Sequence, residues 1–96
     1  MRPSEALSAN RKSLREIAAR HRVRNLRFFG SALHGTDTAA SDLDLLVDPT
    51  PETTLMDLSA IQVEAELLLG VPVDVLTPRS LPVRVRQRVL AEAESV

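Results

Sequence analysis

The sequence contains no cysteine, and this absence excludes both disulfide bonds and metal sites built from thiolates. Two kinds of apolar segment are also absent: a run long enough to span a membrane, and an N-terminal stretch typical of a secretory signal. The composition is otherwise globular, with 44% hydrophobic and 26% charged residues among 96. We therefore expect a single domain over residues 1–96, soluble and located in the cytoplasm.

Positive charge is missing from the middle of the chain. No Lys or Arg lies between Phe28 and Pro78, whereas nine Asp and Glu residues lie there and arginines flank the segment on both sides. The net charge of −1 argues against nonspecific binding to duplex nucleic acid, and we expect no direct contact with nucleic acid. An acidic centre between basic flanks suits a metal–nucleotide ligand instead. For any single arginine, a solvated helix face is the simpler interpretation.

Apolar periodicity predicts the elements of the first half of the chain. Ser4 is expected to cap a helix that ends near His21. The alternating, aromatic residues at 25–29 predict a short strand that stops at Gly30. Small and polar residues follow, and an apolar run then predicts a buried strand at 43–47.

The second half of the chain is expected to contain helix, strand and helix. Thr54 can cap a long helix that ends at Gly70, a β-branched strand follows at 71–76, and a last helix begins after Pro82. The apolar positions of the long helix have helical spacing and are interpreted as core: Leu55, Leu58, Ile61, Ala65, Leu68 and Leu69. The expected fold class is α/β (α+β), with a small mixed sheet of three or four strands and helices chiefly on one face.

Three aspartates are the candidate catalytic and metal-binding residues. Successive side chains of a strand point to opposite faces, so Asp42 and Asp44 are expected on the same face, about 6 to 7 Å apart. Two carboxylates this close repel each other unless a cation neutralises them, and oxygen ligands favour Mg²⁺, with Mn²⁺ as the alternative. Asp74 adds a third acid from another strand. Three carboxylates suit a two-metal site for phosphoryl transfer.

The Gly30-Ser31 pair is a candidate phosphate loop. Glycine lets the backbone approach a phosphate closely, because no Cβ stands in the way. Ser31 can donate its hydroxyl and its amide at the start of a short helix. Either motif alone is common, but a Gly-Ser pair directly after one strand and paired acids at the start of the next make chance a poor explanation.

Together these residues resemble the signature of a known superfamily. Phe29-Gly30-Ser31, then Gly35, then the run from Ser41 to Val47 are similar to the motif of the DNA polymerase β-like nucleotidyltransferases. The segment from Val73 to Pro78, followed by an arginine-rich helix, resembles the minimal nucleotidyltransferase branch, and the similarity covers nearly the whole chain. Members of this branch are commonly antitoxins of the HEPN/MNT type.

The resemblance implies a fold, a reaction and residue roles. It implies the polymerase β-like palm, in which an antiparallel pair of strands bears the loop and the paired acids. It also implies ATP with Mg²⁺, and transfer of AMP onto a tyrosine of a partner HEPN-domain ribonuclease toxin, which silences the toxin. By resemblance, Gly30 and Ser31 bind the triphosphate and Asp42 and Asp44 bind the metals. Asp74 is the third ligand and activates the acceptor hydroxyl.

The loop departs from the family pattern at one position. Many relatives have an arginine just before the second glycine, where this chain has His34 before Gly35. We count His34, Gly35 and Ser41 among the candidate phosphate-binding residues, because a protonated imidazole can donate to a phosphate oxygen. A solvent-facing loop residue is the alternative for His34.

Three other polar residues are expected to play no part in chemistry. Asp37 is placed in a turn, and Asp48 is interpreted as the end of its strand. His21 is expected on the surface at the end of a helix.

Two other functions remain open on the sequence. One is an antitoxin that neutralises its partner by binding alone, with the acids kept as a vestige. The other is a nucleotidyltransferase of small molecules, although the chain lacks a second domain to shape such a pocket. A homo-oligomer is compatible with either.

Overall fold

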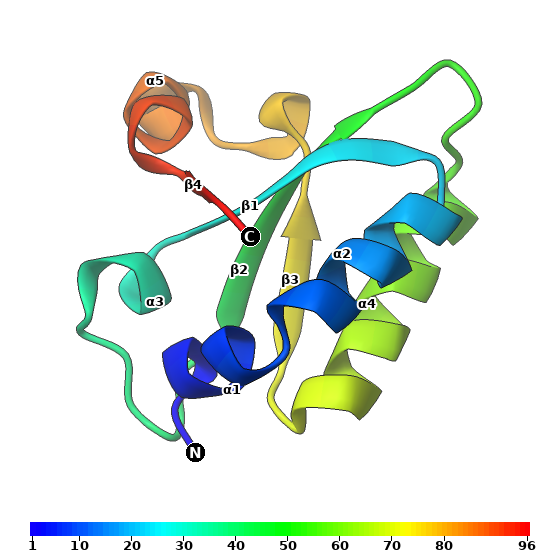
Figure 1. The fold of residues 1–96 in the computed structure, drawn as a ribbon. Coiled ribbons are helices and arrows are strands. Elements are labelled where there is room, and N and C mark those ends of the chain that lie inside the picture. Colours follow the sequence, from blue (N-terminus) through cyan, green and yellow to red (C-terminus); the bar gives the residue numbers. More distant parts are fainter.

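A four-stranded mixed sheet with the order β3-β2-β1-β4 forms the centre of the computed structural model, which describes residues 1–96 (Figure 1). Strand β1 (Val23–Phe29) pairs antiparallel with β2 (Leu43–Pro49). Strand β3 (Val73–Leu76) runs parallel to β2 at one edge, and the two-residue β4 (Glu94–Ser95) pairs antiparallel with β1 at the other. The mixed sheet predicted from the sequence is confirmed, with β4 as an addition.

The helices lie chiefly on one face of this sheet, as predicted. Helices α1 (Pro3–Ala9), α2 (Arg11–Arg20) and α4 (Leu55–Leu69) pack on that face. Helix α5 (Val83–Glu92) packs on the other face, after the short 3₁₀ turn η1 (Pro78–Ser80). The single-turn helix α3 (Ser31–His34) follows the end of β1 (Figure 1). None of the helices combines the length and hydropathy that crossing a membrane requires.

Strand β2 separates the two layers of the core by its alternation. Leu43 and Leu45 are fully buried among side chains of α1, α2 and α4. Leu46 is equally buried but contacts the opposite layer, where it packs with Phe29 and with Val89 of α5. Asp44 shares the face of Leu46, because side chains two positions apart point the same way. The site acids therefore lie on the face that α5 partly covers.

The predicted first helix is two helices, and Ser4 does not cap it. Helix α1 begins after Arg2, and Asn10 interrupts the helical backbone with φ −134° before α2 starts. The side-chain amide of Asn10 donates to the carbonyl of Ala6 at 2.9 Å, a local bond that competes with continuing the helix. Ser4 instead donates from its amide and hydroxyl to Asp37, at 2.8 and 3.1 Å.

The long helix α4 has the predicted ends but a different buried face. Thr54 forms a capping box with Asp57, and Gly70 ends the helix in a left-handed conformation. Ile61, Ala65 and Leu69 are buried as expected, whereas two of the predicted core leucines are not: Leu55 is 82% exposed and Leu68 is 37% exposed. Met56, Val63 and Leu67 are exposed as well. A helix that is apolar on all sides gives the sequence little means of indicating which side faces the core.

Candidate active site

The sheet register brings the predicted aspartates together at one end of β2 and β3, beside the end of β1. Asp44 on β2 is the direct register partner of Asp74 on β3 and of Phe29 on β1. Neighbouring strands lie about 4.8 Å apart, so Asp44 and Asp74 stand side by side on one face. Asp42 lies two residues before Asp44, just ahead of the strand, and is exposed like Asp74. Asp44 is the central acid, and it is only partly accessible to solvent.

Burial and neighbouring negative charge both disfavour the ionised form of Asp44. Burial, together with the negative charges of Asp74 and Asp42, raises the pKa of its carboxyl group from 3.8 to about 6. No hydrogen bond or ion pair from the protein compensates this carboxylate. A divalent cation would relieve the repulsion, and three carboxylates are the hard oxygen donors that Mg²⁺ or Mn²⁺ accepts. The donor set therefore fits a divalent metal.

The carboxylates form an open set rather than a closed cage. In this conformation no three His, Asp or Glu side chains lie close enough together to enclose a metal ion. Asp42 and Asp74 are both exposed, so rotation of their side chains toward Asp44 meets little packing resistance.

Gly30 is required by its contact with the central acid. Its φ of 75° is unfavourable for a residue with a side chain, and a Cβ at this position would stand 2.4 Å from Oδ2 of Asp44. The carbonyl oxygen of Gly30 also accepts from the amides of Leu33 and His34, both at 3.1 Å, and so starts α3. The sequence prediction assigned Gly30 to the close approach of a phosphate. The structure adds a second reason, which is clearance for the Asp44 carboxylate.

The remaining loop candidates divide into two groups. Ser31 and His34 line a cavity beside Gly30, and Nε2 of His34 lies 3.1 Å from Oε2 of Glu92 on α5. Gly35 and Ser41 do not line this cavity. Gly35 ends α3 in a left-handed conformation, and Oγ of Ser41 accepts from the amide of Thr38 at 2.9 Å within its own turn. In this conformation Gly35 and Ser41 shape the loop.

The cavity has a volume of about 500 Å³ and separates the phosphate-loop candidate from helix α5. One wall comes from the end of β1, from α3 and from the residues after it: Phe29, Gly30, Ser31, His34 and Thr36. The other wall comes from a single face of α5: Val85, Arg88, Val89 and Glu92. Sequence reasoning missed this second wall. The four residues are spaced i, i+3, i+4 and i+7, which places them on one face of a helix. Because two of them are valines and two are charged, the sequence pattern does not mark this face as apolar or polar.

Asp37 and Asp48 have stronger structural roles than the sequence indicated. Asp37 is buried, at 5% exposure, and the two bonds from Ser4 join α1 to the loop that leads to the acids. The amide of Ser4 lowers the pKa of the Asp37 carboxyl group. Asp48 lies inside β2 rather than ending it, and its carboxylate accepts from Arg27 at 2.6 Å and from Asn25 at 3.0 Å.

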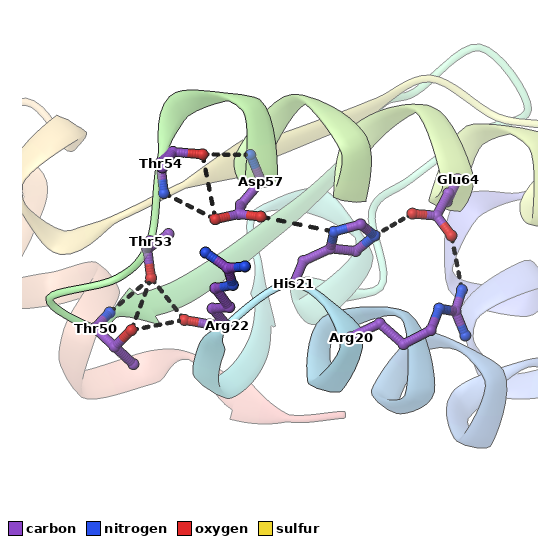
Figure 2. Close-up of polar contacts among 8 residues, drawn as sticks. All are labelled: Arg20, His21, Arg22, Thr50, Thr53, Thr54, Asp57 and Glu64. Carbon is purple, nitrogen blue, oxygen red and sulfur yellow. Dashed lines mark hydrogen bonds and ion pairs between the residues drawn. The ribbon is translucent and has the colours of Figure 1, made fainter.

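His21 lies at the end of α2 as expected, but its side chain is only partly exposed. Its side chain is 20% exposed and stands between two acids of α4, with Nδ1 at 3.9 Å from Asp57 and Nε2 in hydrogen-bond contact with Glu64 (Figure 2). Arg20 adds an ion pair to Glu64 at 2.7 Å. The hydrogen bonds from Arg20 and then from His21 lower the pKa of Glu64. This cluster joins α2 to α4.

A second set of bonds in Figure 2 ties the loop after β2 to the start of β1. The hydroxyls of Thr50 and Thr53 both donate to the carbonyl of Arg22, at 3.1 and 2.6 Å. The pairing of Val23 with Pro49 puts these contacts at the far end of β1 and β2 from Asp44. The polar residues of Figure 2 therefore hold the scaffold together and form no hydrogen bond or ion pair with Asp42, Asp44 or Asp74.

Comparison with known proteins agrees with this fold and this site. The nucleotidyltransferase domain family matches residues 11–96. The protein adenylyltransferase MntA of Thermococcus cleftensis is 36% identical over 86 residues, which are 90% of this chain and 84% of that protein. A solved structure described as a candidate minimal nucleotidyltransferase is 40% identical, covers 97% of this chain and 95% of its own, and superposes with a TM-score of 0.86. The chain belongs to the nucleotidyltransferase domain family and is a nucleotidyltransferase enzyme.

A more distant structure shares the fold. A toxin–antitoxin structure with AMP-PNP is 19% identical, with a TM-score of 0.75 over 90% of this chain and 71% of that one. At this identity the similarity concerns the architecture alone. A nucleotide substrate and a divalent metal are general features of the family to which the chain belongs.

Proposed function

We propose that this enzyme transfers AMP from ATP to a protein hydroxyl, and that it acts as the antitoxin of a HEPN-domain ribonuclease whose tyrosine receives the AMP. The observation that carries the proposal is the position of three carboxylates beside Gly30 at one end of the sheet. The name of the 36% identical relative, protein adenylyltransferase, supports AMP as the transferred group. The toxin–antitoxin neighbour supports a toxin as the acceptor.

The reaction is a nucleophilic substitution at the α-phosphorus of ATP. The acceptor oxygen forms a bond to this phosphorus, the bond to the β-phosphate oxygen breaks, and pyrophosphate leaves. The hydroxyl proton passes to a carboxylate oxygen of Asp74, which is exposed and able to release it to solvent. Gly30 and Ser31 hold the phosphates by their backbone amides and the serine hydroxyl.

Asp42, Asp44 and Asp74 would hold the divalent metal, which we take to be Mg²⁺. When bound, it neutralises phosphate charge and lowers the pKa of a coordinated hydroxyl. Asp44 is held in place by the strand on which it lies and by its contact with Gly30. Asp42, two residues before it, and Asp74, its register partner on β3, would supply the other ligands.

The direct test uses ATP labelled at the α-phosphorus and a purified HEPN-domain ribonuclease toxin, the proposed acceptor. We expect the label to appear on the toxin only when Mg²⁺ is present, with a mass increase of one AMP on a tyrosine peptide. Asp42→Asn combined with Asp44→Asn should abolish transfer, while Glu16→Gln, an exposed residue of α2, serves as the matched charge control. Continued transfer by the double variant would contradict the proposal.

The alternative function has a different signature. An antitoxin that works by binding alone would neutralise the ribonuclease equally well without ATP, and the double Asp→Asn variant would protect cells as well as the wild type. Loss of protection in that variant, with complex formation unchanged in a pull-down, supports catalysis.

A further inference from the structure

The cavity beside Gly30 is lined by an arginine, whereas the phosphate loop has no Lys or Arg of its own. The segment from Phe28 to Pro78 contains no Lys or Arg, so neither the phosphate loop nor the acid strands provide a fixed positive charge. Arg88 of α5 is the one Lys or Arg that lines the cavity. It reaches the site from a helix that packs on the same face of the sheet as Asp44.

The guanidinium of Arg88 has no bonding partner within the protein. It takes part in no hydrogen bond and no ion pair within the chain, and its side chain is exposed. Its neighbour Arg86 differs in this respect, because Nη2 of Arg86 donates to the carbonyls of Arg79 and Leu81. An arginine that lines a cavity without an internal partner keeps its five donors available for a ligand.

Glu92 does not neutralise Arg88, although it lies one helical turn away. The carboxylate of Glu92 is 3.1 Å from Nε2 of His34, and this contact ties α5 to α3 across the cavity. His34 is thereby directed to a carboxylate instead of to a phosphate. His34, the loop side chain that could donate to a phosphate, is thus in contact with another partner, and the guanidinium on the opposite wall lines the same cavity.

We propose that Arg88 is the phosphate-binding arginine of this enzyme, and that it binds the terminal phosphates of the nucleoside triphosphate from helix α5. The inference rests on the proposed function, since it presupposes a triphosphate held at Gly30 and Ser31. A guanidinium suits this task because its planar donors match two phosphate oxygens at once. The same wall also contains the apolar Val85 and Val89, and Glu92, whose carboxylate is in contact with His34.

Binding of AMP-PNP, measured by calorimetry with Mg²⁺ and without any acceptor, tests this inference separately from catalysis. We expect Arg88→Gln to weaken AMP-PNP binding by about 10- to 100-fold, the effect of losing hydrogen bonds to a charged group. Binding of AMP should change by less than about twofold, because AMP lacks the terminal phosphates. Arg88→Lys should recover part of the loss, since a point charge replaces the bidentate fork.

The matched control is Arg84→Gln, on the same helix. Arg84 is exposed and does not line the cavity, so we expect AMP-PNP to bind this variant as it binds the wild type. If AMP-PNP binding weakens equally in both variants, only the overall positive charge of α5 matters, and the assignment of Arg88 is overturned. Equal loss of AMP and AMP-PNP binding would also overturn it, by indicating damage to the cavity.

The outcomes distinguish this inference from the function on which it rests. If Arg88→Gln binds AMP-PNP normally while the wild type transfers AMP, the inference is wrong and the function stands. If the wild type binds AMP-PNP with the dependence on Arg88 given above but modifies no toxin, the phosphate-binding role stands and the acceptor must be sought elsewhere. If the wild type does not bind AMP-PNP, both are refuted.

Discussion

The central acid should weaken the fold in the absence of metal, and Asp44→Asn should therefore stabilise the protein while abolishing its activity. The carboxylate of Asp44 is partly buried, has no compensating partner, and faces the charges of Asp74 and Asp42. Asparagine keeps the shape and removes the charge. The perturbation thus isolates the electrostatic cost of the site from its packing.

The size of the expected stabilisation follows from the raised pKa of Asp44. A rise from 3.8 to about 6 corresponds to about 3 kcal/mol if converted in full. Solvent and salt screen a partly exposed group, so we expect about 1–2 kcal/mol. The sign follows from linkage: a folded pKa above the unfolded value contributes stability that is present below the unfolded pKa and is lost as pH rises through the folded value. The wild type should lose this contribution between about pH 4 and pH 7, and Asp44→Asn should not.

The assay is urea unfolding in EDTA at pH 3.5 and pH 8 for the wild type, Asp44→Asn and the exposed control Glu16→Gln. We expect Asp44→Asn to exceed the wild type by about 1–2 kcal/mol at pH 8 and to differ little at pH 3.5. Saturating Mg²⁺ should stabilise the wild type and leave Asp44→Asn nearly unchanged. A variant that is less stable than the wild type at pH 8, or a difference independent of pH, would refute this reasoning.

Three further changes probe the loop and the scaffold. Gly30→Ala should reduce AMP transfer by at least about 100-fold in a label-transfer assay, because its Cβ would meet Oδ2 of Asp44 at 2.4 Å; activity near that of the wild type would contradict this role. Asp37→Ala should cost about 1–3 kcal/mol in urea unfolding at pH 7 and much less near pH 3. The lowered pKa of Asp37 means that its contribution is lost as pH falls, so an equal cost at both pH values would contradict the assignment. His21→Ala should cost about 1–2 kcal/mol in unfolding without changing the KM for ATP, and a changed KM would show that the two ends of the sheet are coupled.

The paired acids could be predicted from sequence because strand geometry leaves little freedom. The period of two places Asp42 and Asp44 on one face, and the apolar neighbours Leu43 and Leu45 fix which face is buried. The position of Asp74 beside Asp44 needed the strand pairing, and the resemblance to the superfamily supplied it in advance of the structure. The caps of α4 followed from local chemistry at Thr54 and at the glycine after the helix.

The parts that sequence reasoning missed depend on contacts between distant residues. The break in the helix at Asn10 follows from the hydrogen bond of its side chain to Ala6 and from the hydrogen bonds that Ser4 donates to Asp37. No periodicity in the sequence predicts either interaction. Strand β4 is two residues long and has no recognisable pattern. Arg88 could be placed on the correct helix but not at the cavity, since its neighbours on that face include both apolar and charged residues.

The register between β1 and β2 brings Gly30 and Asp44 together, and the number of residues in the loop between the two strands does not. Phe29 faces Asp44 across β1 and β2, so the glycine after one strand meets the acid on the other whatever the length of the loop between them. Insertions or deletions in that loop near Gly35 are therefore compatible with the chemistry over evolutionary time. A single-residue insertion inside β2 is not, because it would turn Asp44 into the core. Searches for distant relatives should accordingly let the spacing between the Gly-Ser pair and the first aspartate vary, and should hold fixed the alternation of acid and leucine that follows.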